Sequence, residues 1–342
     1  MDILITEDLQ APAIDALAGK FSVVREPVLW KDADRLKAAM ADARTVMVRN
    51  QTQLTAEVLA AAPKLIGIGR VGVGLDNIDL KAATERGITV IAPLDANAVS
   101  VAELTLGLLL ALARKIPQAD RSTKAGGWDR RGCTGTELAG KTLAICGFGR
   151  IGKLVAKRAA VFGMRLVVFD PFVKPGDATM SETGATHCST LGEALSQADF
   201  VTTHSPLTPE TKRMFNERTF TVIKRGAFFV NTSRGGVVDE TALLAALQSG
   251  HLAGAALDVR EVEPPPYSGG LRAPGLRNDS ERGSQTAATA FETMENVILT
   301  PHVGSFTHEA QTRTFEAVCA DLERLLRGEA ALNAVNRPAT SR

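Results

Sequence analysis

A glycine-rich turn carries the clearest chemical signal in the sequence. Gly147, Gly149 and Gly152 form the pattern Gly-x-Gly-x-x-Gly immediately after a predicted strand at 143–146, and they open a predicted helix. In such a turn the first glycine permits a tight bend, the second lets the backbone approach a pyrophosphate, and the third allows close packing of helix on strand. The N–H groups at the helix N-terminus attract phosphate. The pattern therefore predicts a dinucleotide-binding site.

An acidic residue indicates which dinucleotide this site prefers. Asp170 follows the next predicted strand, 166–169. A carboxylate there can accept hydrogen bonds from the adenosine ribose hydroxyls, and it would repel the 2′-phosphate of NADP. We therefore predict NAD as the cofactor. A second run of spaced glycines, 67–74, is not followed by such an acid, and we interpret it as a turn whose backbone N–H groups could bind a small anion.

Composition narrows the class of protein. The chain has 342 residues, with 39 Lys and Arg against 38 Asp and Glu, and a formal net charge of +1. Near-neutral charge argues against nucleic acid or an anionic membrane as the main partner. The apolar fraction of 45% and the charged fraction of 23% are typical of a globular protein. At about 150 residues per domain, the length predicts two domains.

Location and metal binding are also constrained. No stretch approaches the roughly 20 apolar residues of a membrane span, and the N-terminus lacks the pattern of a secretory signal. The cysteines are far apart and form no Cys-x-x-Cys pair, which favours thiols in a reducing compartment over a disulfide or zinc framework. We therefore expect a cytoplasmic protein with no metal site. The cysteines are Cys133, Cys146, Cys188 and Cys319.

Two series of short apolar runs alternate with segments of helical pattern, which predicts an α/β fold with parallel sheets covered on both faces. The first series predicts four strands, at 2–6, 45–49, 65–68 and 89–92. The second predicts six strands, at 143–146, 166–169, 200–203, 227–230, 253–257 and 297–300.

Helical segments define the proposed domain boundaries. A helix at 101–114 is apolar nearly all round, with Ser100 and Glu103 as a predicted capping box, so we expect it to be buried on every side. It could belong to a core or to a subunit interface, and we favour a homodimer interface. The pattern at 305–328 predicts a helix that returns to the first domain. The segment 264–290, rich in Pro, Gly and Ser, is interpreted as an irregular loop insertion.

Several further motifs stand in order along the chain, and together they resemble the D-isomer-specific 2-hydroxyacid dehydrogenase family. They are the segments at 72–79, 100–104, 231–240, 256–259 with 263–264, and 300–304. The segments at 69–79 and 116–143 look most like the phosphoglycerate dehydrogenases of that family. The resemblance implies two doubly wound domains: a flavodoxin-like substrate domain of 1–98 plus 305–342, and a Rossmann NAD-binding domain of 99–304 inserted into it.

The resemblance also implies the catalytic residues. Its Arg, Glu and His positions match Arg234, Glu263 and His302. An imidazole can exchange the hydroxyl proton that accompanies hydride transfer, a carboxylate can fix its tautomer, and a guanidinium can hold the substrate carboxylate. Each residue alone is more often structural, and it is their joint occurrence beside the glycine turn that favours catalysis. His187, His251 and His308 keep a structural interpretation.

Further contacts are carried over from the family match. For the cofactor these are Val73, Gly147, Gly149, Arg150, Ile151, Gly152, Asp170, His204, Ser205, Pro206, Thr232, Ser233, Asp258 and Gly304. For the substrate they are Arg49, Val73, Gly74, Asn97 and Arg234, where Arg49 would meet a distal phosphate and Arg130 is a weaker candidate. Either arginine could equally be a solvated charge.

The predicted activity is NAD-dependent hydride transfer at C2 of a 2-hydroxy or 2-oxo acid, with 3-phosphoglycerate as the leading substrate. A glyoxylate or hydroxypyruvate reductase is the alternative within the class, and a dinucleotide-sensing corepressor the alternative outside it. Two departures from the family pattern stand out: the insertion between Glu263 and His302, and Arg260 where the family often has an aromatic residue. The resemblance is to a short form, so we expect no C-terminal regulatory domain.

Overall fold

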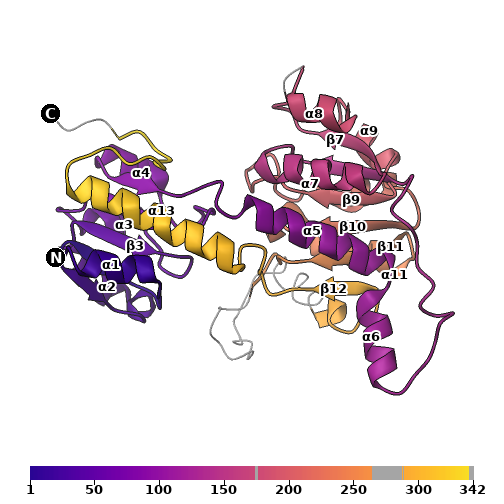
Figure 1. Ribbon diagram of the computed structural model, residues 1–342, viewed down its shortest axis with the longest axis horizontal. Coiled ribbons are helices and arrows are strands. Elements are labelled where there is room, and N and C mark those ends of the chain that lie inside the picture. Colours follow the sequence, from indigo (N-terminus) through magenta and orange to yellow (C-terminus); the bar gives the residue numbers. More distant parts are fainter. Residues whose placement is uncertain (174–175, 264–286, 288, 339–342) are drawn as a thin grey trace. The chain divides into compact units, whose positions relative to one another are not determined.

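The computed structural model divides the chain into two compact units. The first unit contains Met1–Ala98 and Ser305–Arg342, and the second contains Val99–Gly304. The structure describes residues 1–173, 176–263, 287 and 289–338. Each unit is built on one sheet with helices on it (Figure 1).

The first unit has a five-stranded parallel sheet in the order β2-β1-β3-β4-β5, which is the flavodoxin-like arrangement. The strands are β1 (Ile3–Ile5), β2 (Val23–Arg25), β3 (Thr45–Val48), β4 (Gly67–Arg70) and β5 (Thr89–Ile91). All the residues of β1 and β3 are buried, as expected for strands covered on both faces. The edge strand β2 is short and largely exposed, and the sequence pattern did not indicate it.

Helices cover both faces of this sheet, so each face has its own core. The helices are α1 (Pro12–Ala18), α2 (Ala33–Met40), α3 (Ala56–Ala60), α4 (Leu80–Glu85) and α13 (His308–Leu326). One core joins α1 and α13 through side chains that include Ile14, Leu17, Val318 and Leu322. The other joins α2, α3 and α4 through Leu36, Leu59 and Ala83. The C-terminal helix therefore completes the fold of the N-terminal segment.

The interpretation of 67–74 as an anion-binding turn is wrong for its first half. Gly67 and Gly69 lie within strand β4. A Cβ atom at Gly69 would lie 2.7 Å from a methyl group of Val318 on α13. These glycines therefore let a helix from the other end of the chain approach the strand. Gly72, with φ of +145°, and Gly74 lie after the end of the strand.

The second unit has a seven-stranded parallel sheet in the order β12-β11-β10-β9-β6-β7-β8, the Rossmann arrangement with one added strand. The strands are β6 (Thr142–Cys146), β7 (Arg165–Phe169), β8 (Thr186–His187), β9 (Phe200–Thr203), β10 (Ala227–Asn231), β11 (Leu252–Leu257) and β12 (Val297–Leu299). Six of them match the predicted strands, and the two-residue edge strand β8 is additional. The α/β fold class with two parallel sheets is confirmed.

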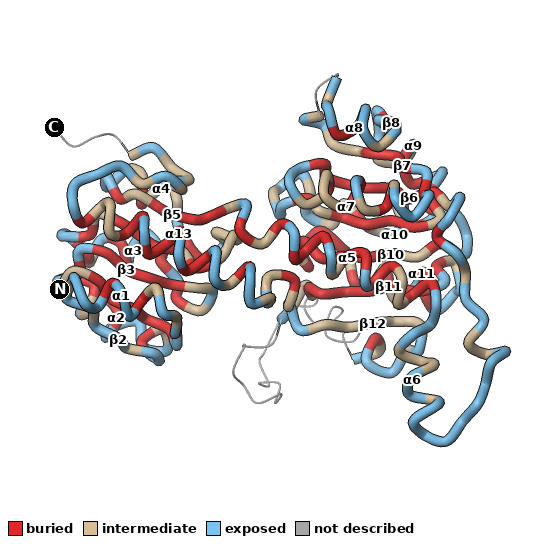
Figure 2. Tube along the Cα trace, in the orientation of Figure 1, coloured by how far each residue is buried: buried red, intermediate tan, exposed pale blue. Residues whose placement is uncertain are grey.

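Two cores again lie on opposite faces. One includes α5 (Ala98–Ala113) and α7 (Arg150–Val161). The other includes α9 (Leu191–Ser196), α10 (Glu217–Val222) and α11 (Glu240–Gln248), with the rings of Phe215, Phe220 and Phe229 in mutual contact. The strands between them are mostly buried (Figure 2).

The helix predicted at 101–114 begins earlier than expected. Because α5 starts at Ala98, Ser100 lies inside the helix, and Glu103 points outward to an ion pair with Arg158 at 3.4 Å. The predicted capping box is therefore wrong. The helix is also not buried on every side, since Val99 and Gly107 are exposed.

Pro117 does not terminate this helical region. It opens a second helix, α6 (Ile116–Lys124), after Lys115 adopts a left-handed conformation. None of the residues of α6 is buried (Figure 2). Of the predicted insertion at 264–290, residues 264–286 and 288 lie outside the described residues, and 287 and 289–290 are helical.

Within the ranges that the structure describes, no helix is long and apolar enough to cross a membrane. The same ranges contain no group of three or more His, Cys, Asp or Glu side chains placed to hold a metal ion. The four cysteines are free thiols.

Candidate active site

The glycine turn has the backbone geometry that its sequence predicts. Gly147 has φ of +95°, and a Cβ there would lie 2.8 Å from backbone atoms of His204 and Ser205. A Cβ at Gly152 would overlap the carbonyl oxygen of Gly147. At Gly149, the residue that caps α7, a Cβ would meet nothing within 4 Å. The space beside the helix N-terminus is thus open at the one glycine that a phosphate must approach.

Asp170 lies against this turn at the end of β7. Its Oδ2 accepts a hydrogen bond from the backbone N–H of Phe148 at 2.6 Å, and its Oδ1 accepts one from Phe172 at 2.8 Å. The carboxylate is therefore held in place by Phe148, the residue between the first two glycines of the motif. This is where an acid must lie to meet the ribose of a dinucleotide bound at Gly149.

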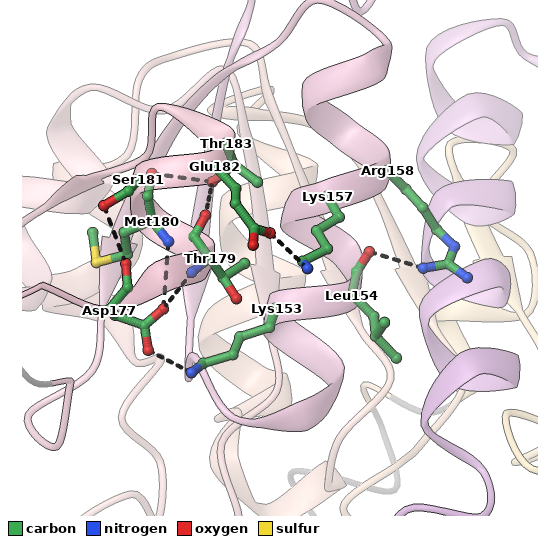
Figure 3. Close-up of polar contacts among 10 residues, drawn as sticks. All are labelled: Lys153, Leu154, Lys157, Arg158, Asp177, Thr179, Met180, Ser181, Glu182 and Thr183. Carbon is green, nitrogen blue, oxygen red and sulfur yellow. Dashed lines mark hydrogen bonds and ion pairs between the residues drawn. The ribbon is translucent and has the colours of Figure 1, made fainter.

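Ion pairs fasten the segment after Asp170 to helix α7 (Figure 3). Lys153 pairs with Asp177, and Lys157 pairs with Glu182 at 2.6 Å. Asp177 also caps α8 (Ala178–Thr183) by accepting from the backbone N–H groups at 179 and 180. The Lys153 ammonium is the main reason that the pKa of Asp177 lies below its usual value. Helix α8 is thereby attached to the helix that begins at the glycine turn.

The turn after β9 completes the cofactor side of the site. The backbone N–H of His204 donates to Cys146 at 2.7 Å, and the Ser205 hydroxyl donates to the same carbonyl at 3.3 Å. The His204 Nε2 lies 3.2 Å from the Thr202 hydroxyl, while its Nδ1 is buried with no hydrogen-bond partner among the described residues. Burial lowers the pKa of His204 to about 3, so this ring is neutral at working pH.

The three predicted catalytic residues follow three neighbouring strands of one sheet. Arg234 follows β10, Glu263 follows β11, and His302 follows β12. Because the strands are parallel, their carboxyl ends lie along the same edge. The Nδ1 atom of His302 lies 2.9 Å from Oε2 of Glu263. Both side chains are partly exposed, at 45% and 38%, so a ligand can reach the pair.

The loop that carries His302 wraps around a buried carboxylate. Asp258, which is 2% exposed, accepts hydrogen bonds from the Thr300 hydroxyl and from the backbone N–H groups of Val303 and Gly304. Its own carbonyl accepts from the backbone N–H of His302 at 2.8 Å. His302 has φ of +53°, a left-handed conformation that a non-glycine residue keeps only when its surroundings hold it. Asp258 supplies that support.

Arg234 is held by the side chain of Asn231, which begins the 231–240 motif but was given no role from the sequence. The Asn231 amide donates to the Arg234 carbonyl at 2.9 Å, and its Oδ1 accepts from both the backbone and the hydroxyl of Ser233. The hydroxyl oxygens of Thr232 and of Thr105 on α5 lie 2.9 Å apart, within hydrogen-bonding distance. The expected cofactor residues after β10 are thus fixed by neighbours on both sides.

Four of the predicted substrate residues, Arg49, Val73, Gly74 and Asn97, lie in the first unit, and Arg234 lies in the second. Arg49 and Asn97 line a small pocket, together with Arg70, Gly72 and other residues of the first unit. The Arg49 guanidinium lies 4.3 Å from the ring centre of Phe306. The lining residues do not include Val73, Gly74 or Arg130; Arg130 belongs to the exposed segment after α6. Arg70 also lines this pocket, although the sequence did not indicate it as a substrate residue.

A buried carboxylate organises the loop that carries Arg49. Glu7 accepts hydrogen bonds from the backbone N–H groups of residues 49–52 and from the Thr52 hydroxyl. The Asn77 amide donates to the carbonyls of Arg49 and Thr52. Glu7 belongs to none of the motifs found in the sequence, and Asn77 lies in the 72–79 motif without an assigned role.

Comparison with known proteins assigns the chain to a family. Residues 106–304 match the family described as D-isomer specific 2-hydroxyacid dehydrogenase, NAD binding domain. D-3-phosphoglycerate dehydrogenase from Methanocaldococcus jannaschii is 43% identical over 336 residues, which is 98% of this chain and 59% of that protein. The human protein of the same name is 42% identical over 321 residues, 94% of this chain and 55% of that one. The chain thus spans less than two thirds of the length of these curated relatives.

Solved structures agree with this assignment. The TT0316 protein from Thermus thermophilus aligns with a TM-score of 0.84 at 34% identity, covering 98% of this chain and 100% of that one. D-lactate dehydrogenase from Aquifex aeolicus, complexed with NAD and lactic acid, also has a TM-score of 0.84, at 29% identity, covering 99% and 100%. The chain belongs to the D-isomer-specific 2-hydroxyacid dehydrogenase family. This confirms the predicted family of D-2-hydroxyacid dehydrogenases and NAD as its cofactor.

Proposed function

We propose that this protein transfers hydride between C2 of a D-2-hydroxy acid and NAD, with Arg234, Glu263 and His302 as the catalytic residues. The observation that carries the proposal is the 2.9 Å contact between Glu263 and His302 at the carboxyl edge of the NAD-binding sheet. The open space at Gly149 and the anchored carboxylate of Asp170 fit the pyrophosphate and ribose of NAD. When bound, NAD supplies the group that accepts or releases hydride.

His302 handles the proton in this proposal. Since its Nδ1 faces Glu263, Nε2 is the nitrogen that takes the proton from the substrate hydroxyl during oxidation. The charged imidazolium that results is stabilised by the Glu263 carboxylate. In the opposite direction the imidazolium returns the proton to the carbonyl oxygen. Oxidation therefore begins with a neutral His302, and reduction begins with a protonated one.

Arg234 binds the substrate carboxylate. Its guanidinium can present two parallel N–H donors to a carboxylate and can also polarise the adjacent carbonyl group. The Asn231 amide anchors the Arg234 backbone at 2.9 Å, which limits its movement. We further propose that the amides of Val73 and Gly74, with the side chain of Asn97, assist at the carboxylate.

A phosphorylated substrate, 3-phosphoglycerate, is proposed first. Two arginines, Arg49 and Arg70, line one small pocket of the first unit. The backbone N–H groups of residues 49–52 already donate to Glu7, so a phosphate at this loop would have to be bound by side chains. The curated relatives described above are named D-3-phosphoglycerate dehydrogenase. We therefore propose the first unit as the substrate-binding domain.

A reductase acting on glyoxylate or hydroxypyruvate is the second candidate. A glyoxylate reductase from Paecilomyes thermophila aligns with a TM-score of 0.82 at 27% identity. Such substrates are small and carry no phosphate, so they need no contact from Arg49.

A substrate panel tests the proposal. Purified protein is assayed with NAD and NADP against 2-hydroxy and 2-oxo acids, with and without phosphate, by NADH absorbance. We expect the highest kcat/KM with 3-phosphoglycerate and NAD. Higher kcat/KM with glyoxylate would favour the second candidate. Binding of NAD without turnover of any acid would instead support a dinucleotide-sensing protein and overturn the enzymatic proposal.

We also propose a cytoplasmic homodimer. The interface was predicted at 101–114, but helix α5, which contains these residues, is exposed only in part. No residue of α6 is buried, and the side chains of Ile116 and Trp128 are 52% and 81% exposed. We therefore place the interface on α5 together with α6 and the segment that follows it. Light scattering on a size-exclusion column should give twice the chain mass, and Trp128→Glu should shift the equilibrium toward the monomer. A wild-type protein that is monomeric at micromolar concentration would exclude this dimer.

A further inference from the structure

A buried ion pair lies beneath the segment that carries Glu263. The Arg260 side chain donates from Nε to Oε1 of Glu240 at 3.0 Å and from Nη2 to Oε2 at 3.2 Å. The two side chains are only 13% and 3% exposed. The guanidinium also lies 5.1 Å from the ring centre of the buried Phe291. A bidentate ion pair that also stacks on an aromatic ring restricts the Arg260 side chain to one conformation far more than a surface ion pair would.

This pair is joined to the backbone on both sides of the catalytic segment. Glu240 Oε1 also accepts from the backbone N–H of Glu261 at 2.8 Å. The backbone N–H of Arg260 donates to Oε1 of Glu263 at 3.4 Å, while the other oxygen of that carboxylate contacts His302. Glu240 therefore fixes residues 260–261, and the backbone N–H of Arg260 in turn contacts the Glu263 carboxylate.

The same segment is packed against the loop of Arg234. A Cβ atom at Gly235 would overlap the carbonyl group of Arg260, so the two backbones are in direct contact there. Glu240, at the start of α11, stands a few residues beyond that loop. A second ion pair, from Arg213 to Glu261 at 2.7 Å, ties the same segment to the chain before α10. Arg260 thus lies where the segments of two catalytic residues meet.

We infer that Arg260 is a positioning residue that, through Glu240, holds the Glu263 carboxylate against His302. The inference rests on the proposed function, because it assumes that this pair moves the substrate proton. Removing the guanidinium would leave the Glu240 carboxylate buried with a single backbone donor, so the 260–263 segment would shift to find another partner. Glu263 would then stabilise the His302 imidazolium less well. The other charged groups at this edge, none of which is substituted in the test, are Arg213, Arg234, Asp239, Asp258 and Glu261.

The test compares Arg260→Met and Arg260→Lys with wild type. For Arg260→Met we expect kcat to fall about 10- to 100-fold in both directions, while KM for NAD changes less than about twofold. The pH at which oxidation reaches half its maximum should move down by about 0.5 to 1 unit, because the imidazolium has lost support. Arg260→Lys, which retains the charge but not the fork, should recover part of kcat.

Two controls make the outcome decisive. Lys224→Met removes the exposed pair with Asp199 in the same unit, at the opposite end of strand β10, and it should change neither kcat nor the pH profile. If Arg260→Met does not fold, as judged by circular dichroism, Glu240→Gln takes its place. This variant removes the charge of the carboxylate that Arg260 binds and keeps the size of the side chain. Lower thermal stability with normal kcat and an unchanged pH profile would make Arg260 merely structural and overturn the inference. Near-normal turnover in His302→Ala would instead overturn the proposed function.

Discussion

The Nδ1 atom of His302 lies 2.9 Å from Oε2 of Glu263, although 39 positions of chain separate the two residues. The contact exists because β11 and β12 are parallel neighbours, so the residues that follow them emerge at the same edge of the sheet. Asp258 then holds the loop of His302 in a left-handed turn that directs the imidazole to the carboxylate. The pair is thus a product of strand order and of one buried acid.

His302→Ala should remove at least about 99% of turnover in both directions, because the substrate proton loses its carrier. In the wild type, oxidation should decline at acidic pH, where the imidazole is protonated, and reduction should decline at alkaline pH. Steady-state rates across pH 5 to 10 measure both limbs. His308→Ala, at an exposed position of the first unit, is the matched control and should behave as wild type. A His302 variant with ordinary turnover would contradict the assignment.

Asp170→Ala should lower kcat/KM for NAD by about 10- to 100-fold, as expected when a charged hydrogen-bond acceptor of the ribose is lost. Discrimination against NADP should weaken at the same time, since the negative charge facing its 2′-phosphate is gone. Glu182→Gln, which removes the exposed partner of Lys157, is the control and should preserve the wild-type preference. An unchanged ratio of NAD to NADP efficiency in Asp170→Ala would show that the carboxylate does not contact the ribose.

Arg49→Glu should selectively reduce activity on phosphorylated substrates, by about 10- to 100-fold in kcat/KM, because a charge-assisted contact becomes a repulsive one. Activity on glyoxylate should change little. Arg86→Glu provides a matched charge reversal at an exposed position of the same unit. Equal losses of Arg49→Glu on glyoxylate and 3-phosphoglycerate would remove the phosphate assignment.

His204 should make the folded state sensitive to acid. Burial lowers its pKa to about 3, whereas in the unfolded chain the ring has its usual pKa of about 6.5. Between these pH values the unfolded chain binds a proton that the native state does not, so stability is lost as the pH falls through this window, by up to about 1.4 kcal/mol per unit. Above pH 6.5 the group has no such effect.

Urea unfolding between pH 7 and 4 measures this dependence. His204→Gln should show a shallower loss of the free energy of unfolding over that range than wild type. His187→Gln, at an exposed position on β8, should follow the wild-type slope. Identical slopes for all three proteins would mean that His204 is protonated in the native state.

Parts of the fold followed from local pattern, and others did not. The glycine turn and the six predicted strands of the second sheet were recognisable because apolar runs and turn glycines act over a few residues. The edge strands β2 and β8 were missed because they are short and largely exposed. The glycines of β4 were assigned to a turn. They are needed in the strand because α13, from the far end of the chain, packs closely against it, and a local pattern does not show this contact.

The sequence by itself determined the family, the dinucleotide motif and the types of the three proposed catalytic residues, since these depend on residue identity and short spacing. Only the tertiary structure decided which distant groups support them. Glu7 beneath the Arg49 loop, Asn231 beneath Arg234, Asp258 beneath His302 and Glu240 opposite Arg260 are all buried polar side chains. Burial obliges each of them to find a hydrogen-bond partner, and which partner it finds depends on how strands far apart in sequence are brought side by side.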